Sequence, residues 1–379
     1  MKSPNSNILK KDWVQSLISS IICIVIGLFI AFLVLVIIEP SGAFESIMNV
    51  IKNFFWFKSP STRLKYFGET LVKTVPLLMC ALAVLFSYKV GLFNIGTPGQ
   101  YCAGICAALY AALKWQWGWV PCVLFAMLAG AFLAAIVGFL KAYLNVNEVI
   151  SGIMLNWIVL YFTNATLTAV KNPSSKDTLT IASVNKSALL PTLGLDKLFN
   201  DKYVTIAIPI AIIIAVVIMI ILDKTKFGYE LKATGINKDA AKYCGMMEKN
   251  NIIITLVISG ALAGLGAAFY YLTDFEQWAV TSSTVPAMGF NGIAATFLGG
   301  LNPIGTIFAS YFIQHITAGG AFVDLSKYSS QITDLISALI IYLCAFVLFM
   351  KSEMNKMIKK SEAKRHIKEF NINDEGGNK

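Results

Sequence analysis

Residues 17–38 read LISSIICIVIGLFIAFLVLVII, a run of 22 side chains without a charge. At about 1.5 Å of rise per helical residue, such a run crosses the roughly 30 Å hydrocarbon core of a bilayer. The run is too long for the apolar part of a secretory signal, and no small-residue cleavage site follows it. The stretch therefore predicts a membrane-spanning helix that anchors the start of the chain.

The rest of the chain has the same apolar character. Of its 379 residues, 56% are hydrophobic and only 14% are charged, and the mean hydropathy is +0.67. A soluble protein has about 25% charged residues, and a soluble core of this composition would leave large apolar patches exposed. The composition excludes a soluble multidomain enzyme.

Apolar segments recur along the sequence, and they predict an all-α polytopic membrane protein with about ten transmembrane segments, some of them broken helices. An even number of crossings places both termini on one side, and 19 of the 31 basic residues fall on that side. The positive-inside rule then predicts cytoplasmic N- and C-termini. The predicted segments are 17–38, 72–88, 90–113, 118–140, 149–170, 203–222, 251–273, 279–300, 301–323 and 331–350.

The connections between these segments differ in kind. Residues 39–67 and 167–202 form sizeable outer loops, and the second is either a docking surface for an extracytoplasmic partner or a solvated connector. The inner loop 223–250 carries six lysines; Asn237 is a good N-cap and Gly245 a natural helix stop, so a short surface helix is expected at about 238–244. Such a helix suits docking into a soluble protein. Contact with anionic lipid would explain the lysines but not the capped helix.

No catalytic or metal-binding pattern is present. The only histidines are His315 and His366, and no Ser/His/Asp set or Walker loop occurs. Cys102 and Cys106 share a helix face without further ligands, which indicates core residues. With two arginines in the chain, the net charge of +10 does not indicate nucleic-acid binding. We predict no metal, no cofactor and no enzymatic activity, so active transport would need a partner or an ion gradient.

Two segments are interrupted by glycine and proline at membrane depth: GLFNIGTPGQ at 91–100 and the stretch 286–305. Broken backbone there is tolerated only where protein or a water-filled cavity satisfies it, and transporters build solute pathways from such helices. A tight turn at the cytoplasmic surface is the alternative for the first segment. Small residues at 260, 264 and 268 predict a close helix contact.

Uncharged amides in and beside these segments suit a neutral, hydrogen-bonding solute. We expect Asn94, Gln100, Asn156 and Asn291 to line its pathway. The alternative is that these amides only join helices to one another, which is the more common use of amides inside membranes.

Four collinear stretches resemble the permease subunits of bacterial ABC importers in the branched-chain amino acid/ribose/nucleoside superfamily. They cover about residues 90 to 310, and the first two lean toward the nucleoside-type branch. Thr97-Pro98 replaces a small-acidic pair that this branch often shows, and Lys232 stands where arginine is common. The stretches are GLFNIGTPGQ (91–100), NEVIS with MLN (147–156), GYELKATGIN with AAKYCG (228–245), and GFNGIA, LG and PIG (289–305).

The resemblance implies a permease domain over 1–350, a charged cytoplasmic tail over 351–379 and a coupling loop at about 223–250 docked on an ATPase. It also implies several partners in the bacterial cell membrane: a second, related permease subunit, a cytoplasmic ATPase with two nucleotide-binding domains that holds ATP and Mg²⁺, and an extracytoplasmic substrate-binding lipoprotein. The implied coupling residues are Gly228, Leu231, Lys232, Ala233, Gly235, Asn237, Ala240, Ala241 and Gly245.

The sequence thus predicts a permease subunit that forms half of the translocation pathway for a nucleoside, with a purine nucleoside favoured. The alternatives are a simple sugar or branched-chain amino acid as cargo, or a stand-alone transporter driven by a gradient. The absence of carboxylates within the strong spans argues against proton coupling in a stand-alone transporter.

Overall fold

The computed structural model describes residues 12–324, 326–344, 346–347 and 349–358. These residues form helices, joined by turns and two isolated β-bridges. One α-helix of at least 12 residues overlaps each of the ten predicted segments. In chain order these helices are α2 (Asp12–Ile38), α4 (Pro60–Lys89), α5 (Thr97–Leu113), α6 (Trp119–Leu144), α7 (Glu148–Leu167), α10 (Ala207–Lys224), α13 (Glu248–Tyr271), α14 (Ala287–Leu298), α15 (Pro303–Gly319) and α16 (Ser330–Cys344).

Six of the described helices are long and apolar enough to cross a membrane: α2, α4, α6, α7, α10 and α13. The other four are shorter, from 17 residues in α5 and α15 to 12 in α14. The helical fold is therefore confirmed. The count of about ten crossings and the cytoplasmic termini stay predictions, as does the tail, of which 359–379 lies outside the described residues.

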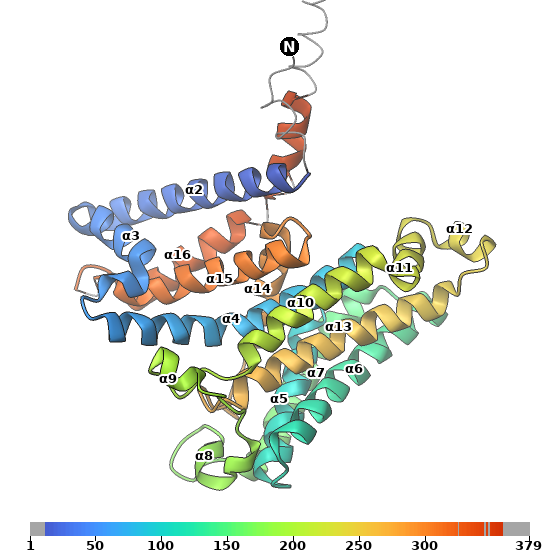
Figure 1. The fold of residues 1–379 in the computed structure, drawn as a ribbon, viewed down its shortest axis with the longest axis horizontal. Helices are drawn as coiled ribbons and strands as arrows, with labels where there is room; N and C mark the ends of the chain where they lie inside the picture. The colour runs from blue at the N-terminus through green and yellow to red at the C-terminus, as the bar shows by residue number, and fades with distance from the viewer. Residues whose placement is uncertain (1–11, 325, 345, 348, 359–379) are drawn as a thin grey trace, which may run out of the picture.

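Helix α4 joins two groups of helices (Figure 1). On one side, α13 packs against α4, α5 and α6, and α7 packs against α5; on the other, α14 and α15 pack against α4, and α16 packs against α2. The hydrophobic core has two corresponding large parts, and a small third cluster includes Leu92 and Leu256. Helix α4 contributes Leu78 and Met79 to one part and Leu77 and Ala81 to the other.

The predicted small-residue contact is present between α13 and α6. A Cβ placed on Gly264 would lie 2.2 Å from the carbonyl oxygen of Ala126, and one on Gly260 would lie 2.3 Å from that of Gly130. Helices approach this closely only where no side chain intervenes. The prediction of close packing along this face of α13 is confirmed.

The segment 39–67, expected as an outer loop, is largely helical, and its place outside the membrane stays a prediction. It contains α3 (Ala43–Lys52) between two short 3₁₀ turns, η1 (Pro40–Gly42) and η2 (Asn53–Trp56), and α4 begins at Pro60. Ala43, Ile47 and Val50 recur at helical spacing and are buried, but the polar residues between them hide this pattern in a search for continuous apolar runs.

Residues 167–202 are mostly irregular, with short helical turns that include α8 (Ile181–Val184) and α9 (Leu195–Phe199). Backbone hydrogen bonds fasten this segment to the chain after α13: the N–H of Thr178 donates to the carbonyl of Trp278 at 2.9 Å, and that of Ile181 to a carboxylate oxygen of Asp274 at 2.9 Å. It is an ordered cover over one end of the bundle, and a docking role for it stays a prediction.

Candidate functional site

The break between α4 and α5 is built around the side chain of Asn94. After α4, the chain turns at Gly91, whose φ is +78°. The Asn94 amide nitrogen donates to Gln100 Oε1 at 2.8 Å and to Ser259 Oγ at 2.7 Å. Its oxygen accepts from the N–H of Gly96 at 3.0 Å and from Gln100 Nε2 at 3.1 Å. Asn94 thus makes four hydrogen bonds, one to the backbone of the break and three to the side chains of Gln100 and Ser259.

Two further polar side chains extend this arrangement to other helices. Asn156 of α7 accepts from the N–H of Gly99 at 2.8 Å and donates to the carbonyl of Ile95 at 3.0 Å. Ser259 of α13 donates to the carbonyl of Ala83 in α4 at 2.7 Å. We call Asn94, Gln100, Asn156 and Ser259 the amide cluster; all four are nearly completely buried.

The structure therefore brings together three of the four predicted pathway residues, and it joins them to each other and to the backbone. Sequence reasoning missed Ser259, whose only signal is a hydroxyl in a run of small residues. Asn291 is half-buried on α14 and has no side-chain hydrogen-bond partner among the described residues. A pathway role for the four amides stays a prediction, and their hydrogen bonds support the alternative of helix joining for three of them.

The inner loop 223–250 contains two helices where one was predicted: α11 (Lys226–Ile236) and α12 (Lys238–Tyr243). Helix α12 confirms the short helix expected at about 238–244. Asn237 caps it by accepting from the N–H groups of Asp239 and Ala240 at 3.0 Å each, and Gly245 follows with a φ of +81°. Helix α11 was missed because its interrupted apolar pattern resembles a charged loop; Thr225 caps it.

The implied coupling residues occupy different environments within this pair. Leu231 and Ala241 are buried, Ala233 is half-buried and Ala240 is exposed. Lys232 forms an ion pair with Asp223 at 3.1 Å. The set thus includes packing residues as well as surface residues.

Two of the glycines in this region are needed for close backbone contacts. A Cβ on Gly228 would lie 2.1 Å from the carbonyl oxygen of Ile221, so α11 folds tightly back on the end of α10. A Cβ on Gly235 would lie 2.3 Å from the backbone of Val90, next to Gly91. The helix pair α11–α12 therefore contacts both α10 and the break that leads to the amide cluster.

An exposed apolar surface lies at this end of the molecule. Tyr243 is 93% exposed, Ile236 87% and Met247 68%, with Lys238 and Lys242 also exposed. We call Ile236, Tyr243 and Met247 the apolar rim. Exposed apolar side chains of this size are typical of contacts with another protein or with a membrane.

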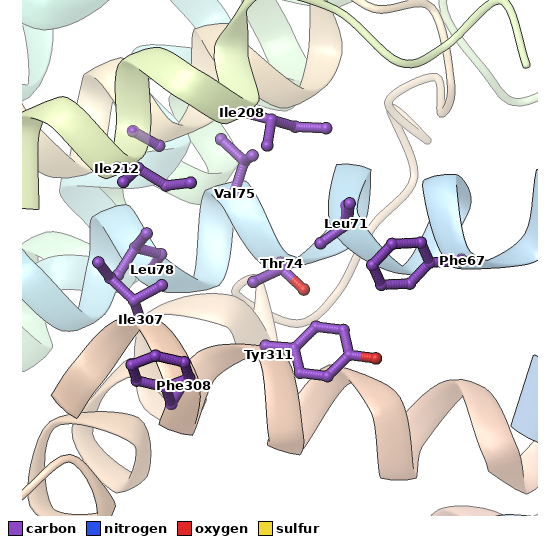
Figure 2. Close-up of a pocket in the computed structure, with 11 residues that line it drawn as sticks. Phe67, Leu71, Thr74, Val75, Leu78, Ile208, Ile212, Ile307, Phe308 and Tyr311 are labelled. Carbon is purple, nitrogen blue, oxygen red and sulfur yellow. The ribbon is translucent and has the colours of Figure 1, made fainter. Parts of the chain in front are cut away.

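A groove of about 350 Å³ lies between α4, α10 and α15 (Figure 2). In Figure 2, Phe67, Thr74 and Tyr311 lie toward one end and Leu78, Ile307 and Phe308 toward the other. The lining is almost entirely apolar. The groove is lined by Phe67, Leu71, Thr74, Val75, Leu78, Ile208, Ala211, Ile212, Ile307, Phe308 and Tyr311.

These features define a class of protein: a helical membrane protein with a broken helix, an apolar groove and an exposed apolar rim at one end. Among the described residues no three His, Cys, Asp or Glu side chains gather as a metal site. The family described as the branched-chain amino acid transport system / permease component matches residues 66–345. The chain belongs to this family.

The chain is similar to several named permeases. It is 35% identical to the nucleoside ABC transporter permease protein NupB of Lactococcus lactis, over 78% of this chain and 84% of NupB. It is 32% identical to the guanosine ABC transporter permease protein NupP of Bacillus subtilis, over 78% and 85%, and 30% identical to NupQ of the same organism, over 74% and 90%. No solved structure matches it.

Family membership sets the role of the chain. It is the permease subunit of an ABC importer in the cell membrane, a transport subunit without catalytic activity, and ATP is handled by a partner ATPase. A stand-alone transporter driven by a gradient does not fit this membership.

Proposed function

We propose that this chain forms half of the translocation pathway for a nucleoside, with a purine nucleoside favoured. The observation that carries this proposal is the similarity to nucleoside and guanosine permeases over more than two thirds of each chain. A simple sugar or a branched-chain amino acid is the alternative cargo, and the family description names the latter.

A second permease subunit would supply the other half. NupP and NupQ of Bacillus subtilis are two guanosine permeases of one organism, and this chain is similar to both. We infer that this chain likewise pairs with a related subunit, and that an extracytoplasmic lipoprotein delivers the solute.

The ATPase would dock on α11 and α12. The apolar rim supplies exposed anchors, and the lysines beside it supply charge for an acidic partner surface. Since α11 contacts both α10 and the break at Gly91, movement of the docked ATPase would reach two transmembrane elements directly.

Uptake by the reconstituted importer tests the cargo. The complex is co-purified with its ATPase and second permease, placed in liposomes with the binding lipoprotein, and supplied with ATP and labelled guanosine. We expect ATP-dependent uptake of labelled guanosine. Unlabelled nucleosides should reduce this uptake by competition, and ribose and leucine should not. Competition by ribose or leucine alone would reject the nucleoside and support the alternative cargo.

Capture of the ATPase subunit tests the docking surface. The double variant Ile236→Ala, Tyr243→Ala removes two anchors of the apolar rim, and we expect about tenfold or greater loss of co-purified ATPase, as for truncation of interface hot spots. The matched control is Leu198→Ala, a 60% exposed apolar residue of α9 at the other end of α10. Undiminished ATPase capture by the double variant would reject α11–α12 as the docking site.

A further inference from the structure

The groove between α4, α10 and α15 is separate from the amide cluster. The two regions share no residue, although both involve α4. The groove also differs in having open space: a volume of about 350 Å³ falls in the size range of small-molecule sites, which are mostly apolar and aromatic with few polar groups.

We propose that this groove, rather than the amide cluster, is the wall along which the solute passes, and that it contacts the flat face of the nucleobase without reading its edges. This inference rests on the proposed nucleoside cargo. The structure supports it through the rings that line the groove, the few polar atoms among them, and the connection of α10 to the docking surface.

Three aromatic side chains line the groove. Phe67 and Tyr311 meet edge to face with ring centroids 6.1 Å apart, and Phe308 is 70% exposed. Every nucleobase has a π-face, so stacking on such rings is strong but tolerant of base identity. A lipid acyl chain would also fit an apolar groove, and the test below distinguishes the two occupants.

The lining offers little hydrogen-bonding capacity. Thr74 and Tyr311 are the only polar lining residues. The Thr74 hydroxyl already donates to the carbonyl of Thr70 at 2.7 Å, and the Tyr311 hydroxyl lies 3.5 Å from His315 Nδ1. Discrimination between bases requires hydrogen bonds to their edges, so the groove would pass different nucleosides with similar ease. Selection among them then falls to the delivering lipoprotein.

The long axis of the groove follows helix α4. From Phe67 to Leu78 its lining follows α4 for about 16 Å at the helical rise, and Phe67 contacts Phe199 of α9 with ring centroids 5.9 Å apart. Figure 1 shows α9 and α11 at opposite ends of α10. The Phe67 end of the groove therefore lies toward the end of the bundle away from the apolar rim.

Helix α10 connects the groove to the docking surface. It supplies Ile208, Ala211 and Ile212 to the lining, and only Thr225 separates its end from α11. Because Gly228 holds α11 against the backbone of Ile221 and Leu222, α10 and α11 form a tight corner. A displacement of α11 by the ATPase would tilt α10 and change the width of the groove.

A matched pair of tryptophan substitutions tests the groove as a pathway. Ile212 and Val217 lie on the same helix and are each 44% exposed, but only Ile212 lines the groove. In the reconstituted importer, we expect Ile212→Trp to lower the rate of guanosine uptake about tenfold or more by filling the space, while ATP hydrolysis stimulated by the loaded lipoprotein continues. Val217→Trp is expected to transport normally. Wild-type uptake by Ile212→Trp would overturn the proposal.

A second variant decides the matter if Ile212→Trp fails to assemble. Phe308→Ala shortens an exposed side chain, and we expect it to raise the KM for guanosine and for cytidine by a similar factor of about five to ten, the size of one lost stacking contact. An unchanged KM for both, as expected if an acyl chain occupies the groove, would overturn the proposal, and so would a shift confined to one base. A wild-type complex that imports no nucleoside would instead reject the proposed function itself.

Discussion

The amide cluster and the groove both involve α4, but they use polar atoms in opposite ways. In the cluster, the side chains of Asn94, Gln100, Asn156 and Ser259 are buried and hydrogen-bonded to each other or to backbone. In the groove, eleven side chains surround open space with two hydroxyls among them. In a bilayer, unpaired polar groups are costly, so a dense set of paired amides favours a joint between helices. Open space with few hydrogen bonds favours contact with a passing solute through ring faces.

The largest effect expected from this comparison is on stability. Asn94→Ala removes four hydrogen bonds and leaves partners unpaired, which at about 0.6–1 kcal/mol each lowers the free energy of unfolding by about 2–4 kcal/mol. Thermal unfolding of the purified subunit in detergent measures this loss. Asn291→Ala is the control, because Asn291 has no side-chain partner among the described residues. If the Asn94→Ala protein has the native melting temperature but a raised KM for transport, the amide cluster and not the groove would be assigned as the solute pathway.

The corner between α10 and α11 is expected to have the next largest effect. Gly228→Ala places a Cβ 2.1 Å from the carbonyl oxygen of Ile221 and forces α11 away from α10. We expect uptake to fall about tenfold while ATPase capture is retained, since the apolar rim is unchanged. Gly118→Ala, where the nearest atom would be 3.7 Å away, controls for the substitution. Normal uptake by Gly228→Ala would show that the corner between α10 and α11 does not couple the groove to the docking surface.

A smaller effect is expected from the phenol group of Tyr311. Tyr311→Phe keeps the ring and removes the hydroxyl, so the KM for guanosine should change less than about twofold, since stacking carries the contact. Uptake kinetics of the reconstituted complex measure this value. A tenfold rise would show that the groove reads its solute by hydrogen bonding, as the amides were expected to do.

The smallest effect is expected at Thr74. Its hydroxyl donates within α4 to the carbonyl of Thr70, and a helix needs no such bond, so Thr74→Val should leave the melting temperature within about 2 °C of native. Uptake is also expected to stay within about twofold of native. A severe transport defect at native stability would assign Thr74 a direct role in solute contact.

Local sequence patterns were sufficient to predict several features of the fold. Apolar runs predicted the ten segments in which helices occur, the Asn237 cap and the Gly245 stop predicted α12, and the small residues of α13 predicted its close contact with α6. These features depend on side chains within a few turns of one another. Helices α3 and α11 were missed because their apolar residues are interrupted by polar ones. Whether such a segment forms a helix depends on its burial against helices that are distant in sequence.

The relation between distant segments could not be predicted in the same way. Nothing in the sequence shows that Ser259 meets Asn94, or that Gly235 abuts the backbone at Val90. An amide in a membrane segment has the same appearance in sequence whether a solute or a neighbouring helix satisfies it. Its use depends on which helix lies opposite.

The sequence by itself determined that this chain is a helical membrane protein, because continuous apolar runs have no other stable environment, and its motifs placed it among ABC importer permeases. Only the tertiary structure decided which polar groups pair inside the bundle and where space remains open. The groove lies where side chains of α4, α10 and α15, which are far apart in sequence, leave a space between them. Packing between distant helices leaves such a space without marking it in the sequence of any one of them.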